Sequence, residues 1–404
     1  MNNLYPLYGF TQQIMQAMDV GPWGALMRLN PLLFPYVEQQ LKRFRVYPKP
    51  PFDITEVERN GKSIPVHEQI LAIEPMCDLV NFVAPGNQSR ERVLIVAPLS
   101  GHYAALLRET VRAFLPDFDV VITDWRAAQQ LPLTHGPFGL DDYVSYVRSF
   151  IERLGDKPLH VVAVCQPAVP VYAALSLQAA HKGKMPRSTV FIGGPIDARI
   201  NPTQVDRFAT DNSLNWFREN TIHTVPHGFP GKGRRVLPGF VQYSGFVQLD
   251  PRRHLDAESK YLNDIIDASL EADEMKKAEI VARAEKHRRF YNDYCAVMDL
   301  PSEYYLDTIR VVFQEFLLAQ GKWEVNGELV DPSAITRGKL IVLEGENDNI
   351  VGIRQTKAAL DLATSLPSAK KFYILAQGVG HYGIFSGWTF RFQIYPQIRD
   401  MMLG

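Results

Sequence analysis

The stretch LHVVAVCQPAVPVYAAL, residues 159–175, constrains the fold of this chain more than any other part of the sequence. It begins with the apolar run HVVAV, residues 160–164, which is typical of a buried strand. Cys165 follows directly, and the next residues contain Pro and are rich in Ala, as at the start of a helix. A thiol between a buried strand and the first turn of a helix occupies the position of a nucleophile in a strand–turn–helix elbow. The stretch therefore predicts an α/β fold with Cys165 as its candidate nucleophile.

Further short apolar runs predict the other strands of the same sheet. They are VLIVA (93–97), VVIT (120–123), TVFI (189–192), LIVL (340–343) and FYIL (372–375). Such runs do not alternate with polar residues, and helical patterns at 103–114, 140–154, 171–181 and 354–362 separate them. Residues 66–83 read as an antiparallel pair at the sheet edge. We expect a mostly parallel sheet with helices on both faces.

The strand–helix rhythm divides the chain into four parts. Residues 1–50 predict a helical flap that ends at a Pro-rich linker. Residues 51–196 and 301–404 predict the two parts of the α/β core, and residues 197–300, which lack a convincing parallel strand, predict an inserted, mainly helical cap. Within the second part, residues 301–320 read as a long amphipathic helix and Asn326-Gly327 as a hairpin turn.

Charge and cysteine content exclude several classes of function. With 43 basic and 44 acidic residues, the net charge of −1 provides no field to attract nucleic acid. The three cysteines are widely spaced and form no CxxC motif, so we expect neither a zinc site nor disulfides, and no other metal or cofactor. The first 34 residues lack the pattern of a signal peptide, and no apolar run approaches the ~18 residues of a membrane span.

Two further residues provide the partners that a nucleophile needs. Asp348 lies in a turn after the run LIVL, and His381 lies in a Gly-rich loop after the run FYIL. The chain order of nucleophile, acid and histidine is that of the α/β-hydrolases. All three residues follow independently predicted strands, so we predict a triad of Cys165, His381 and Asp348 in an α/β-hydrolase fold.

The predicted chemistry is acyl transfer through a thioester. His381 accepts the thiol proton of Cys165, and Asp348 holds the imidazole in the correct tautomer. A helix N-terminus and a histidine partner both favour the thiolate. We expect the backbone N–H of Gln166 and one from Leu99 or Ser100 to stabilise the oxyanion.

Other assignments of these residues stay open. Cys165 could be an inert buried thiol and Asp348 an ordinary turn residue. Asp124 also follows a strand, although we prefer it as an ion-pair partner of Arg126. Ser100 is a rival nucleophile, but it follows the first core strand, where the oxyanion loop belongs.

Substrate contacts are expected from the cap and from the loops around the triad. The apolar, Gly-bearing stretch 236–249 suits an insoluble apolar substrate or, equally well, packing between cap and core. The candidate substrate-binding residues are His102, Phe240, Tyr243, Phe246 and Tyr382.

With these residues in view, the chain resembles the intracellular poly(3-hydroxybutyrate) depolymerases of bacteria. The resemblance extends over most of the chain and rests on VAPLSGHYAALLRETV, VVAVCQPAVP, FIGGPIDARINPT, LEGENDNIVG and GVGHYGIFSG. It implies metal-free hydrolysis of amorphous storage polyester by Cys165, Asp348 and His381, in the cytoplasm at the surface of polyhydroxyalkanoate granules. A general elbow reads G-x-S-x-G, whereas Ala163 and Pro167 flank the nucleophile here. Gln166 keeps the N–H that the oxyanion needs, so the elbow remains feasible.

Two other functions compete with hydrolysis. A polyester synthase-like acyltransferase also uses a cysteine nucleophile, but Ala163 and Pro167 replace the glycines expected on either side of it. A non-catalytic granule-surface protein could keep a hydrolase fold, although the complete set of Cys, Asp and His disfavours this. The sequence leaves open whether the protein forms a homodimer and whether water or a thiol such as coenzyme A accepts the acyl group.

Overall fold

The computed structural model of the chain describes residues 49–87, 90–249 and 251–404. The helical flap expected over residues 1–50 therefore lies outside the described residues, apart from its last two. None of the described helices combines the length and the apolar character needed to cross a bilayer.

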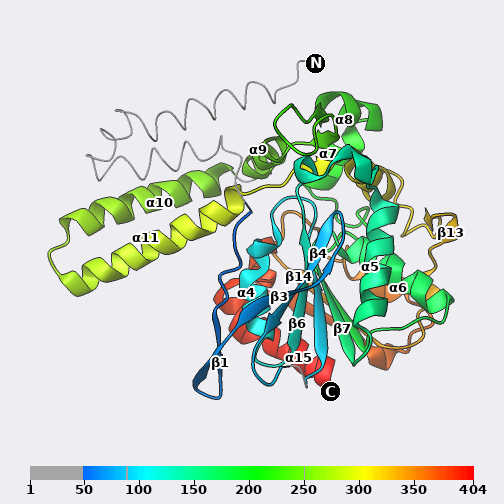
Figure 1. Cartoon of the computed structure of the whole chain (residues 1–404), viewed down its shortest axis with the longest axis horizontal. Coiled ribbons are helices and arrows are strands. Elements are labelled where there is room, and N and C mark those ends of the chain that lie inside the picture. Colours follow the sequence, from blue (N-terminus) through cyan, green and yellow to red (C-terminus); the bar gives the residue numbers. More distant parts are fainter. Residues whose placement is uncertain (1–48, 88–89, 250) are drawn as a thin grey trace.

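An eight-stranded sheet forms the centre of the molecule (Figure 1). Its strands are β3 (His67–Ile73), β4 (Cys77–Val83), β5 (Arg92–Val96), β6 (Asp119–Trp125), β7 (Leu159–Val164), β8 (Ser188–Ile192), β14 (Lys339–Gly345) and β15 (Lys371–Ala376). Their order across the sheet is β15-β14-β8-β7-β5-β6-β4-β3. Strands β15 to β6 are parallel, while β4 is antiparallel to both β6 and β3. This is the mostly parallel sheet and the antiparallel edge that the sequence predicted.

Burial explains why these runs are Val- and Ile-rich without alternation. Every residue of β6 and β7 is buried, because helices cover both faces of a parallel sheet. The flanking helices are α4 (Arg108–Phe114), α5 (Leu140–Leu154), α6 (Ala168–Ala180), α13 (Ala358–Leu362) and α15 (Tyr395–Leu403). Helices α5 and α6 pack side by side (Figure 1). Helix α4 contacts α15 through the rings of Phe114 and Tyr395, whose centroids are 4.7 Å apart. The α/β-hydrolase fold class predicted from the sequence is confirmed.

Residues 197–300 contain no strand of the central sheet. Their helices are α7 (Gln204–Asp211), α8 (Leu214–Asn220), α9 (Gly239–Leu249), α10 (Pro251–Leu270) and α11 (Glu274–Cys295). Short strands β9 (His223–Thr224) and β10 (Arg235–Leu237) form a small antiparallel sheet with β11 (Leu300–Pro301). Helices α10 and α11 run as an antiparallel pair that projects away from the central sheet (Figure 1).

The region after this segment differs in part from expectation. The long helix predicted over residues 301–320 is wrong in extent: helix α12 covers Ser302–Thr308 and continues as wider π-helical turns over Ile309–Gln314. β-Branched Ile and Val residues crowd a regular helix, which favours the wider turns here. The predicted hairpin turn at Asn326-Gly327 is confirmed, because these residues join β12 (Glu324–Val325) to β13 (Glu328–Leu329) with φ angles of 51° and 80°.

A buried carboxylate at the end of β14 fixes the turn that follows. Glu344 is 2% exposed, and its Oε1 accepts the N–H groups of Thr356 (2.8 Å) and Lys357 (2.9 Å). Its Oε2 accepts the N–H of Arg354 (2.9 Å) and the hydroxyl of Tyr373 (2.8 Å). Charged acceptors form the stronger hydrogen bonds, so this one side chain supports residues 354–357.

The E344A substitution should destabilise the fold strongly, because it leaves three backbone N–H groups and one hydroxyl without their acceptor. We expect the free energy of unfolding to fall by about 3 kcal/mol or more, measured by urea denaturation. The control is E346A: Glu346 is exposed and accepts only the Gly378 N–H (2.8 Å), so its loss should cost less than about 1 kcal/mol. Equal losses in both variants would contradict this assignment.

Candidate active site

Cys165 lies in a sharp turn between β7 and α6. Its φ angle of 66° falls in the left-handed region, which costs a residue with a side chain about 1–3 kcal/mol. Its N–H donates to the Ile192 carbonyl at the end of β8 (2.7 Å), and its carbonyl accepts the N–H of Ala168 (3.0 Å). The partly exposed thiol therefore has the strained strand–turn–helix geometry of a nucleophile elbow.

Gly194, two residues after the end of β8, packs tightly against this elbow. A Cβ atom on Gly194 would lie 2.2 Å from the Cβ of Ala168 and 2.9 Å from the Cys165 carbonyl oxygen, so only glycine fits there. The Gly194 N–H donates to Thr356 Oγ1 (2.9 Å), which links the elbow to the turn that Glu344 supports. The glycine pair after the run TVFI was the sequence signal for this contact.

His381 and Asp348 form a hydrogen-bonded pair at the same edge of the sheet. His381 Nδ1 and Asp348 Oδ2 are 2.7 Å apart, and both side chains are almost fully buried. Asp348 Oδ1 accepts the N–H groups of Ile350 (2.8 Å) and Val351 (2.9 Å). The carboxylate is thus held by its own turn while its second oxygen orients the imidazole. This is the geometry that an orienting acid requires.

Both Asp348 and Cys165 affect the pKa of His381. Burial lowers the pKa of His381, but the Asp348 carboxylate and the Cys165 sulfur raise it, and together they hold this pKa well above its ordinary value. The structure therefore brings Cys165, His381 and Asp348 together, with the histidine between the thiol and the carboxylate.

The backbone N–H groups of Leu99, Ser100 and Gln166 are the ones that the sequence predicts as oxyanion donors. None of them donates a hydrogen bond to any residue in the described ranges. Gln166 follows the nucleophile, and the other two lie in the loop after β5, which is where α/β-hydrolases place these donors.

The loop after β5 is attached to the segment that follows α11. Met298 donates its N–H to the Gly101 carbonyl (2.9 Å), and His102 forms an antiparallel bridge with Val297. Gly101 has a φ angle of 100°, and a Cβ there would lie 3.0 Å from the ring of Phe246. The inserted segment therefore contacts the candidate oxyanion loop directly.

Aromatic side chains gather beside the triad. His102 stacks on Phe246 with ring centroids 5.2 Å apart and lies 4.9 Å from Tyr294 and 6.3 Å from Tyr382. Tyr243 is 6.2 Å from Tyr294. Several of these rings line a small cavity of about 30 Å³ together with Asn349 and Ile350, the two residues after Asp348. Four of the five candidate substrate-binding residues thus lie together near the catalytic loops.

One expected substrate contact lies apart, and one expected ion pair is absent. Phe240 packs in a separate cluster with Ala128, Val225 and Val236, and its contact with substrate stays a prediction. The Asp124–Arg126 ion pair is wrong: Asp124 pairs with Lys49, and Arg126 pairs with Asp78. Strand β4 brings Asp78 directly opposite Asp124, at the end of β6. The ion-pair partner of Arg126 therefore comes from the neighbouring strand and not from its own segment.

Tyr304 is a residue near the site that sequence reasoning missed. Its hydroxyl is fully buried and makes no hydrogen bond of ordinary geometry in the described part of the chain, although the Ser100, Thr308 and Gln166 side chains lie close enough to act on it. Burial raises the pKa of Tyr304, the neighbouring Ser100 side chain lowers it, and Cys165 raises it again. The tyrosine hydroxyl therefore lies close to the nucleophile and to both predicted oxyanion segments. The amphipathic pattern of residues 301–320 indicated that one side of this segment, which includes Tyr304, is buried. It did not indicate which residues Tyr304 contacts.

Metal-binding groups are absent from the described residues, where no three His, Cys, Asp or Glu side chains are grouped to hold an ion.

Comparisons with known proteins give one family. Residues 193–403, more than half of the chain, match the family model of the PHB de-polymerase C-terminus. No curated protein sequence matches. Among solved structures, the thioesterase domain from the curacin biosynthetic pathway is 12% identical, with 84% of this chain and 99% of that chain covered and a TM-score of 0.43. The 2-hydroxy-6-oxo-6-phenylhexa-2,4-dienoate hydrolase from Rhodococcus sp. strain RHA1 is 13% identical, with 84% and 100% covered and a TM-score of 0.43.

His102 predicts a pH effect on stability. Burial lowers its pKa from 6.5 to about 4, although the Tyr294 backbone raises it. The unfolded chain binds this proton more readily, so stability is complete above about pH 6.5 and is lost as the pH falls toward 4. In H102F, the loss of unfolding free energy between about pH 7 and pH 4.5 should be about 2 kcal/mol smaller than in wild type. Urea denaturation at both pH values measures this, and H135Q, at an exposed histidine, should behave as wild type.

Proposed function

Since this chain belongs to the PHB de-polymerase C-terminus family and is a carboxylic ester hydrolase, we propose that it hydrolyses the ester bonds of amorphous poly(3-hydroxybutyrate) in storage granules. The observation that carries this proposal is the strained elbow at Cys165 beside the hydrogen-bonded pair of His381 and Asp348. On this proposal, the enzyme acts in the cytoplasm at the granule surface and releases 3-hydroxybutyrate or its oligomers.

Acylation begins with the Cys165 thiolate, whose proton resides on His381. The sulfur attacks the ester carbonyl carbon, and the electron pair of the C=O bond moves to oxygen. When the tetrahedral intermediate collapses, the C–O bond to the leaving chain breaks and His381 protonates the departing alkoxide. The products of this step are a thioester on Cys165 and a shortened polymer chain that ends in a hydroxyl group.

Deacylation uses water and the same histidine. Neutral His381 removes a proton from water as the oxygen attacks the thioester carbonyl. The C–S bond then breaks, the acid is released, and the proton on His381 restores the starting pair with Cys165. Asp348 holds the imidazole throughout and stabilises its charged form. The hydrogen bond of 2.7 Å between the two side chains supports this role.

The oxyanion is stabilised by backbone N–H groups of Gln166 and of the loop at Leu99 and Ser100, and we add the Tyr304 hydroxyl to these donors. A buried hydroxyl without a hydrogen bond of ordinary geometry costs about 1–3 kcal/mol, so a residue that retains one is a candidate for function. The burial of Tyr304 and its position beside Ser100 and Cys165 support this assignment. The ring is held by stacking on Tyr143, with centroids 5.6 Å apart.

The aromatic group at His102, Tyr243, Phe246 and Tyr382 provides the apolar surface for the polymer chain. His102 remains neutral near pH 7, because its pKa is about 4, so it adds no charge to this surface. A neutral, apolar lining suits an uncharged polyester whose chain must leave an insoluble phase.

The C165A substitution should abolish hydrolysis, because no other side chain at the elbow can form the acyl intermediate. Release of acid from amorphous poly(3-hydroxybutyrate) measures this. Iodoacetamide should label Cys165 in the folded wild-type protein, since Cys77 is fully buried and Cys295 is 8% exposed. Hydrolysis that persists undiminished in C165A, or labelling that favours Cys77 or Cys295, would overturn the mechanism.

The Y304F substitution separates function from stability. It removes a hydroxyl that makes no hydrogen bond of ordinary geometry, so the melting temperature should stay equal or rise, whereas kcat on p-nitrophenyl butyrate should fall about 100-fold with little change in KM. Y172F is the matched control: the buried Tyr172 hydroxyl donates to the Ala359 carbonyl (2.6 Å), so this variant should lose about 1–3 kcal/mol of stability and keep its kcat. Unchanged kcat in Y304F would remove Tyr304 from the mechanism and leave the triad untouched.

A further inference from the structure

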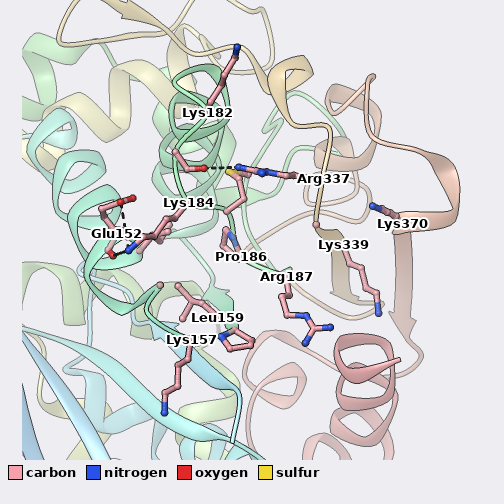
Figure 2. Close-up of a pocket in the computed structure, with 16 residues that line it drawn as sticks. Glu152, Lys157, Leu159, Lys182, Lys184, Pro186, Arg187, Arg337, Lys339 and Lys370 are labelled. Atoms are coloured by element: carbon pink, nitrogen blue, oxygen red, sulfur yellow. Dashed lines mark hydrogen bonds and ion pairs between the residues drawn. The ribbon is translucent and has the colours of Figure 1, made fainter.

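Figure 2 shows a large hollow lined by basic side chains. It lies at the opposite end of the strands from the candidate active site. Its volume is about 730 Å³. Residues at the amino ends of β7, β8 and β14 line it, together with Lys370, which precedes β15. Cys165, Asp348 and His381 follow the carboxyl ends of these strands, so the two sites are separated by the length of the sheet.

Cationic side chains dominate the lining. They are Lys157, Lys182, Lys184, Arg187, Arg337, Lys339 and Lys370. Glu152 is the one acidic residue among the lining residues. In a chain whose net charge is −1, this concentration gives the hollow a positive local field.

Part of this charge is already neutralised within the protein. Lys157 Nζ lies 2.6 Å from Asp119 Oδ2, and Arg187 pairs with Glu91. Lys184 donates to the Glu152 carbonyl oxygen (3.0 Å), and its Nζ lies 3.8 Å from the carboxylate of the same residue. These three cations are therefore held by carboxylates.

The other four cations have no carboxylate partner among the described residues. Arg337 donates to the Gly183 carbonyl (2.8 Å; Figure 2), and Lys339 donates to the Met401 carbonyl (2.9 Å). Lys182 and Lys370 are exposed, and neither side chain forms an ion pair or hydrogen bond in the described ranges. About four positive charges around one hollow thus remain uncompensated.

The negative ends of helices account for only some of these cations. Helices α5 and α6 both end beside the hollow, and basic side chains near a helix C-terminus are favourable. This explains Lys184 and Arg337, which bind carbonyls there. It also applies to Lys339, whose Nζ binds the Met401 carbonyl in the last turn of α15. It does not explain Lys370 before β15, since no α-helix ends there.

Lys182 adopts a left-handed backbone conformation that is unfavourable for a residue with a side chain. It follows α6 with a φ angle of 55°, and the Gly183 N–H donates to the Gln178 carbonyl (2.8 Å), which is the hydrogen bond of a Schellman motif. Glycine is the usual residue at the left-handed position of this motif, because it avoids the steric penalty of a side chain. A lysine here places a charge at the rim of the hollow despite that penalty.

We propose that this hollow is a binding site for a small anion that carries several phosphate groups. Four uncompensated cations match the charge of a di- or triphosphate, and Arg337 offers the planar donor fork that suits phosphate oxygens. The volume of about 730 Å³ is that of a small-molecule site. The site is independent of the proposed hydrolysis.

The test uses the full-length protein and titrates sodium tripolyphosphate by calorimetry at constant ionic strength. We expect one saturable site, whose affinity falls about tenfold or more in the K182A/K370A variant. Neither side chain has a partner in the described structure, so this variant should keep the wild-type melting temperature. The control K276A/K286A removes two exposed lysines of α11 and should bind as wild type.

Competition measurements distinguish which kind of anion the site binds. Competition by ATP but not by sulfate at equal ionic strength supports a site for several linked phosphates, and adenosine alone should not compete. The proposal fails if tripolyphosphate does not bind, or if K276A/K286A weakens binding as much as K182A/K370A does. It also fails if anionic phosphatidylglycerol vesicles or a DNA duplex bind through Lys182 and Lys370 while tripolyphosphate does not.

Discussion

The left-handed backbone at Cys165 is the constraint on which the rest of the structure depends. A residue with a side chain keeps this conformation only where its surroundings enforce it. Here the enforcement comes from the end of β8, which accepts the Cys165 N–H, and from Gly194, whose lack of a side chain leaves room for Ala168. The parallel register of the sheet provides both contacts, so the position of the thiol follows from strand pairing.

Opposite electrostatic environments distinguish two buried histidines of the site. His381 faces Asp348 and Cys165, and these groups outweigh burial and raise its pKa. His102 faces aromatic rings instead, so burial dominates and its pKa is lowered to about 4. One histidine is thereby suited to carry a proton and the other to remain an uncharged part of an apolar wall. The difference arises from the Asp348 carboxylate and the Cys165 sulfur, which face His381 and not His102.

The strands of the central sheet and the candidate catalytic residues could be predicted because each depends on a short stretch of sequence. Apolar runs of four or five residues identified the parallel strands, and residues directly after them identified Cys165, Asp348 and His381, because parallel strands end at one edge of a sheet. Contacts between distant segments could not be predicted in this way. Glu344 looks like an ordinary strand-end residue until the turn at residues 354–357 surrounds it, and Tyr304 looks like any buried helix residue. The Asp124–Arg126 ion pair was predicted wrongly for the same reason, since the partners of both residues come from other segments.

The bridge between His102 and Val297 and the hydrogen bond from Met298 to Gly101 have a consequence for how related enzymes can diverge. The outer parts of helices α10 and α11 project from the body of the molecule, so changes there would leave the central sheet untouched. The end of α11 and the residues after it lack this freedom, because Asp293 pairs with Arg108 of α4, Tyr294 lies 4.9 Å from His102, and Met298 holds the loop that carries Leu99 and Ser100. An exchange of the helical pair between two such enzymes would succeed only if residues 293–298 were left intact.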